Sequence, residues 1–183
     1  MKEHPILFNS EMVKALLEDR KAMTRRLDKG WLKVKKGDRL WVKETWSIES
    51  TAPTSYEIHY LATHPGGAKT IEAGDDLKLN NYLTNLYDTQ RGSWRPSIYM
   101  FRWVSRITLE ATADARLEKL QEISEEDAAK EGMPLVTYGM DRLYGPIPKA
   151  TRIKGFGILW DSLNPKAPWL SNPEVVVLEF KKL

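Results

Sequence analysis

The stretch from Asp19 to Arg26 holds the residue types in this chain that are best suited to chemistry. It reads Asp19-Arg20-Lys21-Ala22-Met23-Thr24-Arg25-Arg26, so four cations flank one hydroxyl. A lysine amine beside a threonine hydroxyl can form a base and nucleophile pair, and clustered cations attract phosphate or a polar nucleobase. Cations at the C-terminal end of a helix also complement the helix dipole, which is the alternative explanation for the same residues.

Lys21, Thr24 and Arg26 form the most specific group within this stretch. An extended strand places Thr24 and Arg26 on one face, and Lys21 at the end of the preceding helix can lean over that face. To act as a base, Lys21 needs a pKa depressed by burial or by neighbouring arginine charges. A glutamate must then carry the proton, and composition alone does not identify it.

Seven tryptophans offer a second kind of chemistry, the stacking of nucleobases. Trp41, Trp160 and Trp169 lie in or near apolar runs, so we expect them in the core. Other aromatic and cationic residues suit an unpaired base held between rings and guanidinium groups, namely Trp46, Trp94, Arg95, Arg102, Trp103 and Arg106. Large aromatic side chains also fill small cores, and both interpretations stay open for this group.

Composition narrows the class of protein. The chain has 183 residues and no cysteine, which suits one domain over residues 1–183 and excludes disulfides and thiolate metal sites. The three histidines lack zinc-site spacing and no glycine-rich nucleotide motif is present, so we expect neither a metal nor a cofactor. No apolar run approaches a membrane span or a signal peptide, so we expect a cytoplasmic protein with no membrane partner.

Periodicity and caps predict a mixed order of strands and helices. We expect helices from Ser10 to about Lys21, at 124–131 and at 153–163, and strands at 6–8, 40–44, 56–60, 103–110 and 174–181. The apolar run at 175–178 is typical of a strand covered on both faces. Residues 66–92 and 134–150 are predicted to be insertions. Because regular strand–helix alternation is absent, we expect an α+β fold, a mixed β-barrel with peripheral helices.

The segment from Asp19 to Arg26 resembles the G-x-K-x-x-T-x-R signature of ASCH domains, which have a PUA-like β-barrel fold. Further similarity lies at residues 6–8, 36–42 and 175–180, and residues 94–98, 105–107 and 123–128 resemble the phage and prophage branch of the family. The resemblance covers nearly the whole chain and is weakest near 66–92 and 134–150. The signature glycine is Asp19 here, and Asp tolerates left-handed backbone better than most residues.

The resemblance implies RNA binding, which is proposed for the family by similarity to PUA domains. Some small members are amidohydrolases that deacylate N4-acetylcytidine, and others are reported as ribonucleases. A lysine, a threonine and a glutamate act in the amidohydrolase pattern, and they match Lys21, Thr24 and Glu131. Lys21 would then be the base, Thr24 the nucleophile or the group that orients water, and Glu131 the proton shuttle. Arg26 matches the signature arginine and would stabilise negative charge.

Three functions follow as hypotheses. The first is an RNA- or nucleotide-binding domain of phage type with a cationic, base-sized pocket. The second is an amidohydrolase acting on N4-acylated cytidine or a related modified nucleoside. The third is a ribonuclease, or a phage accessory protein without catalysis. In each case Arg20 and Arg25 are expected at the helix end or on an outer phosphate-binding surface, and convergence of the catalytic candidates would favour the second.

Overall fold

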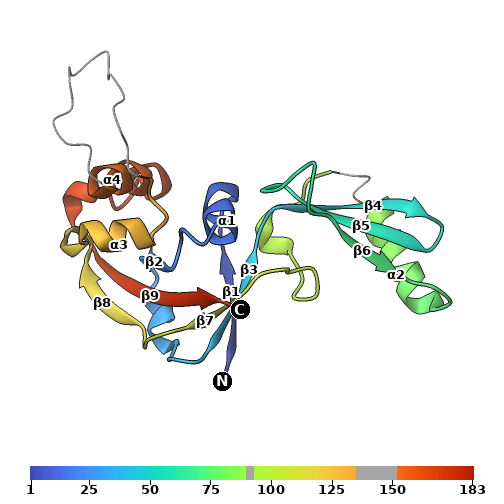
Figure 1. Cartoon of the computed structure of the whole chain (residues 1–183), viewed down its shortest axis with the longest axis horizontal. Helices are drawn as coiled ribbons and strands as arrows, with labels where there is room; N and C mark the ends of the chain where they lie inside the picture. The colour runs from blue at the N-terminus through green and yellow to red at the C-terminus, as the bar shows by residue number, and fades with distance from the viewer. Residues whose placement is uncertain (90–92, 135–151) are drawn as a thin grey trace, which may run out of the picture. The chain divides into compact units, whose positions relative to one another are not determined.

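The computed structural model describes residues 1–89, 93–134 and 152–183, so the insertion expected near 134–150 lies outside the described residues apart from Pro134. The chain divides into two compact units. The first comprises residues 1–2, 15–39 and the described part of 109–183, and the second comprises residues 3–14 and the described part of 40–108. Helices and strands are mixed along the chain, which confirms the α+β class (Figure 1). None of the helices in these ranges has the length and apolar character needed to span a membrane.

Strand β9 (Glu174–Lys182) is the centre of the sheet in the first unit (Figure 1). It pairs antiparallel with β2 (Met23–Arg26) along one edge, and with β7 (Thr108–Ala111) and β8 (Arg116–Lys119) along the other. The sheet curls like part of a barrel around this strand. All residues from Val175 to Leu178 are buried, so the predicted strand with both faces covered is confirmed.

Two helices, α3 (Glu125–Lys130) and α4 (Arg152–Leu163), pack against the first unit's sheet. Their contact buries Ala128, Phe156 and Trp160 against Val175. This contact is apolar because each helix turns its few large apolar residues to the same side. Short 3₁₀ segments connect the elements of this unit: η1 (Lys29–Lys33), η3 (Leu120–Glu122) and η4 (Trp169–Ser171).

The start and the end of α3 are where the sequence predicts them. The Ser124 hydroxyl accepts a hydrogen bond from the Asp127 backbone N–H at 3.0 Å, which caps the first turn. Gly132 follows the helix with φ of +90°, the left-handed conformation that ends many helices. These two caps fix the position of Glu131, the last residue before the turn.

The second unit is built on a three-stranded antiparallel sheet and one long helix. Its elements are β1 (Glu3–Leu7), β3 (Arg39–Lys43), β4 (Trp46–Ala52), β5 (Ser55–Tyr60), β6 (Lys69–Glu72), α2 (Leu77–Asp88) and the 3₁₀ segment η2 (Ser97–Tyr99). The sheet has the order β4-β5-β6, and β1 pairs with β3. Helix α1 (Ser10–Leu17) starts in this unit and ends in the first.

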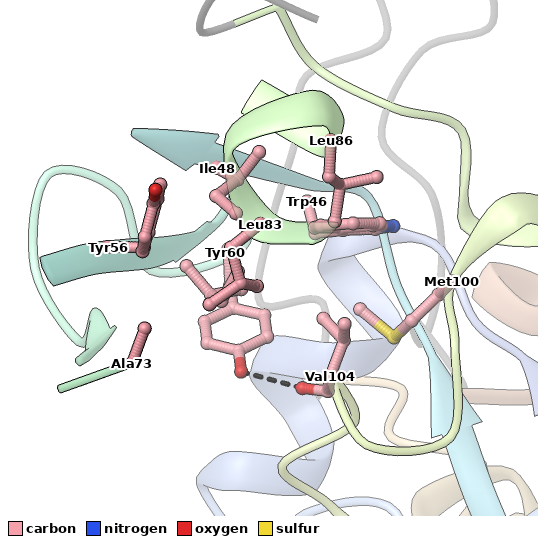
Figure 2. Packing of buried hydrophobic residues seen from close by; sticks show 10 residues of the cluster. Trp46, Ile48, Tyr56, Tyr60, Ala73, Leu83, Leu86, Met100 and Val104 are labelled. Carbon is pink, nitrogen blue, oxygen red and sulfur yellow. Dashed lines mark hydrogen bonds between the residues drawn. The ribbon is translucent and has the colours of Figure 1, made fainter. Parts of the chain in front are cut away.

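Residues 66–92 are not an irregular insertion, which corrects the sequence expectation. They supply β6 and α2, and Leu83 and Leu86 of α2 enter the core of the second unit (Figure 2). In the same core the Tyr60 hydroxyl donates to the Val104 carbonyl at 2.7 Å. Helix α2 was hard to predict because its outer face is polar and only a few apolar residues mark its inner face.

The strand expected at 103–110 is shorter in the structure. Only Thr108–Ala111 forms a strand, because the chain turns between Phe101 and Ser105 and the Val104 carbonyl is used by Tyr60. Strand β8 was not expected from the sequence, since Arg116 to Lys119 alternates charged residues with a single leucine. That strand carries Glu118, which belongs to the site described next.

Candidate functional site

Lys21 and Glu131 are in direct contact in the first unit, although 110 residues separate them. The Lys21 Nζ donates to Glu131 Oε2 at 2.8 Å and to the Glu131 backbone oxygen at 2.9 Å. Their side chains are 1% and 4% exposed. The two residues also form an isolated antiparallel bridge, so the backbone as well as the side chains holds them together.

The turn after α1 positions Lys21. The helix ends at Leu17 rather than near Lys21, which corrects the predicted boundary. Asp19 adopts φ of +56°, so the aspartate that replaces the signature glycine does take left-handed backbone. The chain then runs extended, and the Ala22 backbone N–H donates to the Lys130 carbonyl at 2.7 Å. Lys21 is therefore delivered to Glu131 by backbone pairing with the end of α3.

Gly132 is packed too tightly to carry a side chain, which makes it a test of how the site is assembled. A Cβ at Gly132 would lie 3.0 Å from the Ala15 Cβ and 3.3 Å from the Lys21 Cβ, in addition to the cost of its positive φ. We expect Gly132→Ala to lower the free energy of unfolding by about 2–4 kcal/mol. Urea unfolding measures the loss.

Gly37 provides the matched control, because it has a similar φ of +85° but no atom within 4 Å of the added Cβ. Gly37→Ala should therefore show only the conformational cost, about 1–2 kcal/mol. Equal losses for the two variants would contradict the close packing of Gly132 against Lys21 and Ala15.

Arg25 is buried, which corrects its expected place on an outer phosphate-binding surface. Its guanidinium donates to Glu131 Oε1 at 3.3 Å, Glu118 Oε2 at 3.1 Å and Asp127 Oδ2 at 3.1 Å. Strand alternation explains the error, because Arg25 points to the face of β2 that α3 covers. With three carboxylate partners inside the protein, Arg25 is a structural neighbour of Glu131.

A continuous set of charges extends from this point, and we call it the buried ionic network. Its members, linked pair by pair, are Lys21, Glu131, Arg25, Asp127, Glu118, Arg116 and Glu179. Paired strands carry several of them on one face, since both Arg25 and Arg116 lie opposite Val177 of β9. Carboxylates and cations are nearly balanced in the network, so each buried charge has a partner.

The environment of Lys21 favours its neutral amine more than water does. Burial lowers the pKa of Lys21 from its ordinary 10.5, and the nearby charges of Arg26 and Arg25 add to that effect. The carboxylate of Glu131 opposes it by stabilising the ammonium. Lys21 therefore has the depressed pKa that the sequence analysis required of a base.

Thr24 and Arg26 lie on β2 beside this pair. Thr24 is buried, and strand alternation places it with Arg26 on the face opposite Arg25. Arg26 is close enough for its charge to act on Lys21, and burial lowers the pKa of Arg26 while Glu131 opposes the shift. The structure thus joins Lys21 to Glu131 directly, brings Arg26 within electrostatic reach, and leaves Thr24 at a neighbouring buried position.

Arg20 is the remaining cation of the signature stretch, and it lies at the edge of this site. Its guanidinium donates to the Gly132 carbonyl at 2.9 Å and pairs with Glu18. The expected position near the helix end is correct, since the residue follows the turn after α1. Its role is to tie this turn to the end of α3.

Several of the predicted base-binding residues of the second unit are instead structural. Trp46 is fully buried in the core (Figure 2), which corrects its expected surface role. Arg106 makes two bonds of 2.9 Å to Glu44 and lies 4.0 Å from the Tyr60 ring centroid. Burial raises the pKa of Glu44, and Arg106 opposes that shift. Arg102 is partly exposed but is paired with Glu3.

Other predicted residues of the second unit are accessible. Trp94 and Trp103 are exposed, and the Arg95 guanidinium lies 5.6 Å from the Trp46 ring centroid. Sequence reasoning missed Tyr82 and Phe101, which are exposed and in ring contact with Trp103. The signal for Phe101 was its place in the aromatic and arginine-rich stretch 94–103, whereas nothing local marked Tyr82.

Among residues 1–89, 93–134 and 152–183, no group of three or more His, Cys, Asp or Glu side chains is arranged to hold a metal ion. The chemistry of the candidate site therefore has to be argued from Lys21, Glu131 and their neighbours. Comparison of the chain with protein-family models, with curated proteins and with solved structures finds no match.

Proposed function

We propose that the first unit hydrolyses the amide bond of an acylated nucleoside such as N4-acetylcytidine, with Lys21 and Glu131 as the proton-transfer pair. The observation that carries the proposal is the 2.8 Å contact between the Lys21 Nζ and Glu131 Oε2 within a buried setting. This chemistry is also the one that the resemblance to ASCH amidohydrolases implies for the same two residues.

The proton balance of the reaction follows from this pair. Passing one proton from the Lys21 ammonium to Glu131 leaves a neutral amine and a neutral acid, and burial favours both over separated charges. The amine then accepts a proton from the attacking hydroxyl, and Glu131 donates its proton to the departing nitrogen. One water is consumed, the acyl C–N bond breaks, and cytidine and acetate are released.

Thr24 and Arg26 complete the proposed site. Thr24 is either the nucleophile, with an ester intermediate that water then hydrolyses, or the group that orients the attacking water. Arg26 supplies positive charge for the oxyanion that develops on the acyl oxygen, and an arginine keeps that charge despite burial. Arg25 holds Glu131 from the other side through its Oε1 atom, which fixes the direction of Oε2 toward Lys21.

Hydrolysis explains the buried charges of the first unit better than a phosphate-binding surface does. Arg20 and Arg25 were the cations expected to meet phosphate, but their guanidinium groups are engaged by Glu18 and by the carboxylates around Glu131. A buried lysine with a lowered pKa, by contrast, is suited to proton transfer.

Incubation with N4-acetylcytidine, followed by chromatographic detection of cytidine and acetate, tests this function. We expect turnover by the wild-type protein and equal molar release of the two products. N4-acylated cytosine and an acetylated lysine peptide define the substrate class, and the nucleoside should be preferred. Absence of turnover on all N-acylated substrates would overturn the proposal.

The pH dependence of the rate should report Lys21. Because the neutral amine is the active form, kcat/KM is expected to rise with pH through the lowered pKa of Lys21, below 10.5, and then to level off. Rate measurements on the alkaline side of neutrality locate this limb. A limb centred at the ordinary lysine value would contradict the depressed pKa.

Stability provides an independent check of the same pKa. The unfolded chain binds more protons than the folded protein between the lowered pKa and 10.5, so the free energy of unfolding should rise with pH over that window. Lys21→Met removes the titrating amine, and the difference between wild type and variant isolates its contribution. A difference that falls with rising pH would mean that Glu131 outweighs burial.

A further inference from the structure

Three exposed aromatic rings lie together in the second unit, and we call them the aromatic platform: Tyr82, Phe101 and Trp103. Their relative exposures are 44%, 38% and 38%. The rings of Phe101 and Trp103 are nearly parallel, with planes 7° apart and centroids 6.1 Å apart. Tyr82 meets both rings edge-on, at centroid distances of 6.5 and 6.3 Å. The platform is therefore one continuous apolar surface.

Buried residues hold the aromatic platform in place. Phe101 meets the buried Trp46 edge-on at 6.2 Å. Met100 and Val104, which flank the platform residues in sequence, point into the core (Figure 2). The rings are thus fixed before any ligand arrives, which reduces the entropic cost of binding.

Positive charge lies beside the platform. Residues 93–108 include three arginines and no acidic residue. Lys69 donates to the Trp103 carbonyl at 2.9 Å, and no carboxylate of the described residues pairs with Lys69 within 4.0 Å. Lys78 is exposed on α2 four residues before Tyr82, hence on the same face of that helix. These two lysines supply cations at the edge of an aromatic surface.

We propose that the aromatic platform binds the unpaired bases of a single-stranded nucleic acid. Every base has a flat face that can stack on the exposed rings, and the neighbouring lysines match the phosphates that link the bases. An apolar protein segment would match the rings but would gain nothing from Lys69 and Lys78. This site lies in a different unit from Lys21 and Glu131, so it does not depend on the proposed hydrolysis.

Fluorescence anisotropy with labelled oligouridylate, oligodeoxythymidylate and a duplex of equal length tests the proposal. We expect both single strands to bind and the duplex to bind more weakly. Trp103→Leu and Phe101→Leu should each raise Kd by about 5- to 150-fold, the usual effect of losing one stacking ring. Lys69→Gln should lower the slope of log K against log salt by about 1.

Tyr99→Leu is the matched control, because Tyr99 is exposed in the same segment without an aromatic contact among the described residues. It should leave Kd unchanged, and Tyr82→Leu provides a third variant if either ring substitution impairs folding, as judged by thermal unfolding. Unchanged Kd in all folded platform variants, or equal binding of the duplex, would overturn the proposal. So would a dimer that dissociates on Trp103→Leu in a protein that binds no oligonucleotide, since the platform would then be a self-association surface.

Discussion

Lys21→Met is expected to lower kcat/KM for N4-acetylcytidine by about 10²- to 10⁴-fold, the range typical of losing a general acid or base. Methionine keeps the length and apolar stem of lysine but cannot exchange a proton. Glu131 keeps Arg25 as a partner at 3.3 Å, so the carboxylate is not left without a counter-charge. The variant should therefore fold, and the loss should appear in the rate of the chemical step. Steady-state assays on N4-acetylcytidine measure it.

Lys29→Met is the control for the same chemical change. Lys29 pairs with Glu174 at 2.9 Å in the same unit, but both side chains are largely exposed. Exposed pairs contribute little, so both the rate and the free energy of unfolding should stay close to wild type. If Lys21→Met retained the wild-type rate, Lys21 would have no catalytic role and the buried pair would be purely structural.

The pairing of Lys21 with Glu131 is the part of the site that was accessible from sequence, and only through the family resemblance. Nothing in the local pattern of residues 125–132 marks Glu131 among several neighbouring acids. The caps at Ser124 and Gly132 did predict that Glu131 ends a helix, and that end is where β2 meets it. Local signals therefore gave the element, and the resemblance gave the partner.

The position of Arg25 could not be read from sequence, because its three carboxylate partners lie 93, 102 and 106 residues away. Arginine is seldom buried, so a surface position was the reasonable expectation. What decides its burial is the face of β2 on which it falls, and this depends on the register with β9. Register is a long-range property that no local pattern in residues 19–26 determines.

The same limit explains the second unit. Alternation predicted β5 correctly, since Tyr56, Ile58 and Tyr60 face the core. The helix α2 escaped prediction because its apolar face is narrow, and it is stable only where Leu83 and Leu86 meet that core. Trp46 was assigned to a surface on the strength of nearby cations, although one of them, Arg95, lies against its ring from outside the core.

Glu131→Leu is expected to lower the free energy of unfolding by about 3–5 kcal/mol, because it leaves the buried Lys21 without its only printed carboxylate partner and removes one partner of Arg25. Arg25 still has Asp127 and Glu118, so most of the cost falls on Lys21. Urea unfolding at neutral pH measures this loss. Glu126→Leu is the control, since Glu126 forms an exposed pair with Lys130 on the same helix.

The double variant Lys21→Met/Glu131→Leu separates the stabilising role of the pair from its proposed chemistry. Replacing both charges by apolar side chains of similar size removes the unpaired buried ammonium, so the double variant should be more stable than Glu131→Leu alone. The coupling free energy from the cycle should be about 1–3 kcal/mol. Additive losses would mean that the two charges are not coupled in solution.

Activity in the double variant then decides what the pair is for. A purely structural pair predicts that recovered stability brings recovered hydrolysis, because the fold around Thr24 and Arg26 is restored. A proton-transfer pair predicts a stable protein that remains inactive, because neither methionine nor leucine can take a proton from the nucleophile or give one to the leaving nitrogen. Stability and rate must therefore move in opposite directions between Glu131→Leu and the double variant only if the buried contact is chemical: the free energy of unfolding rises while the rate stays at background.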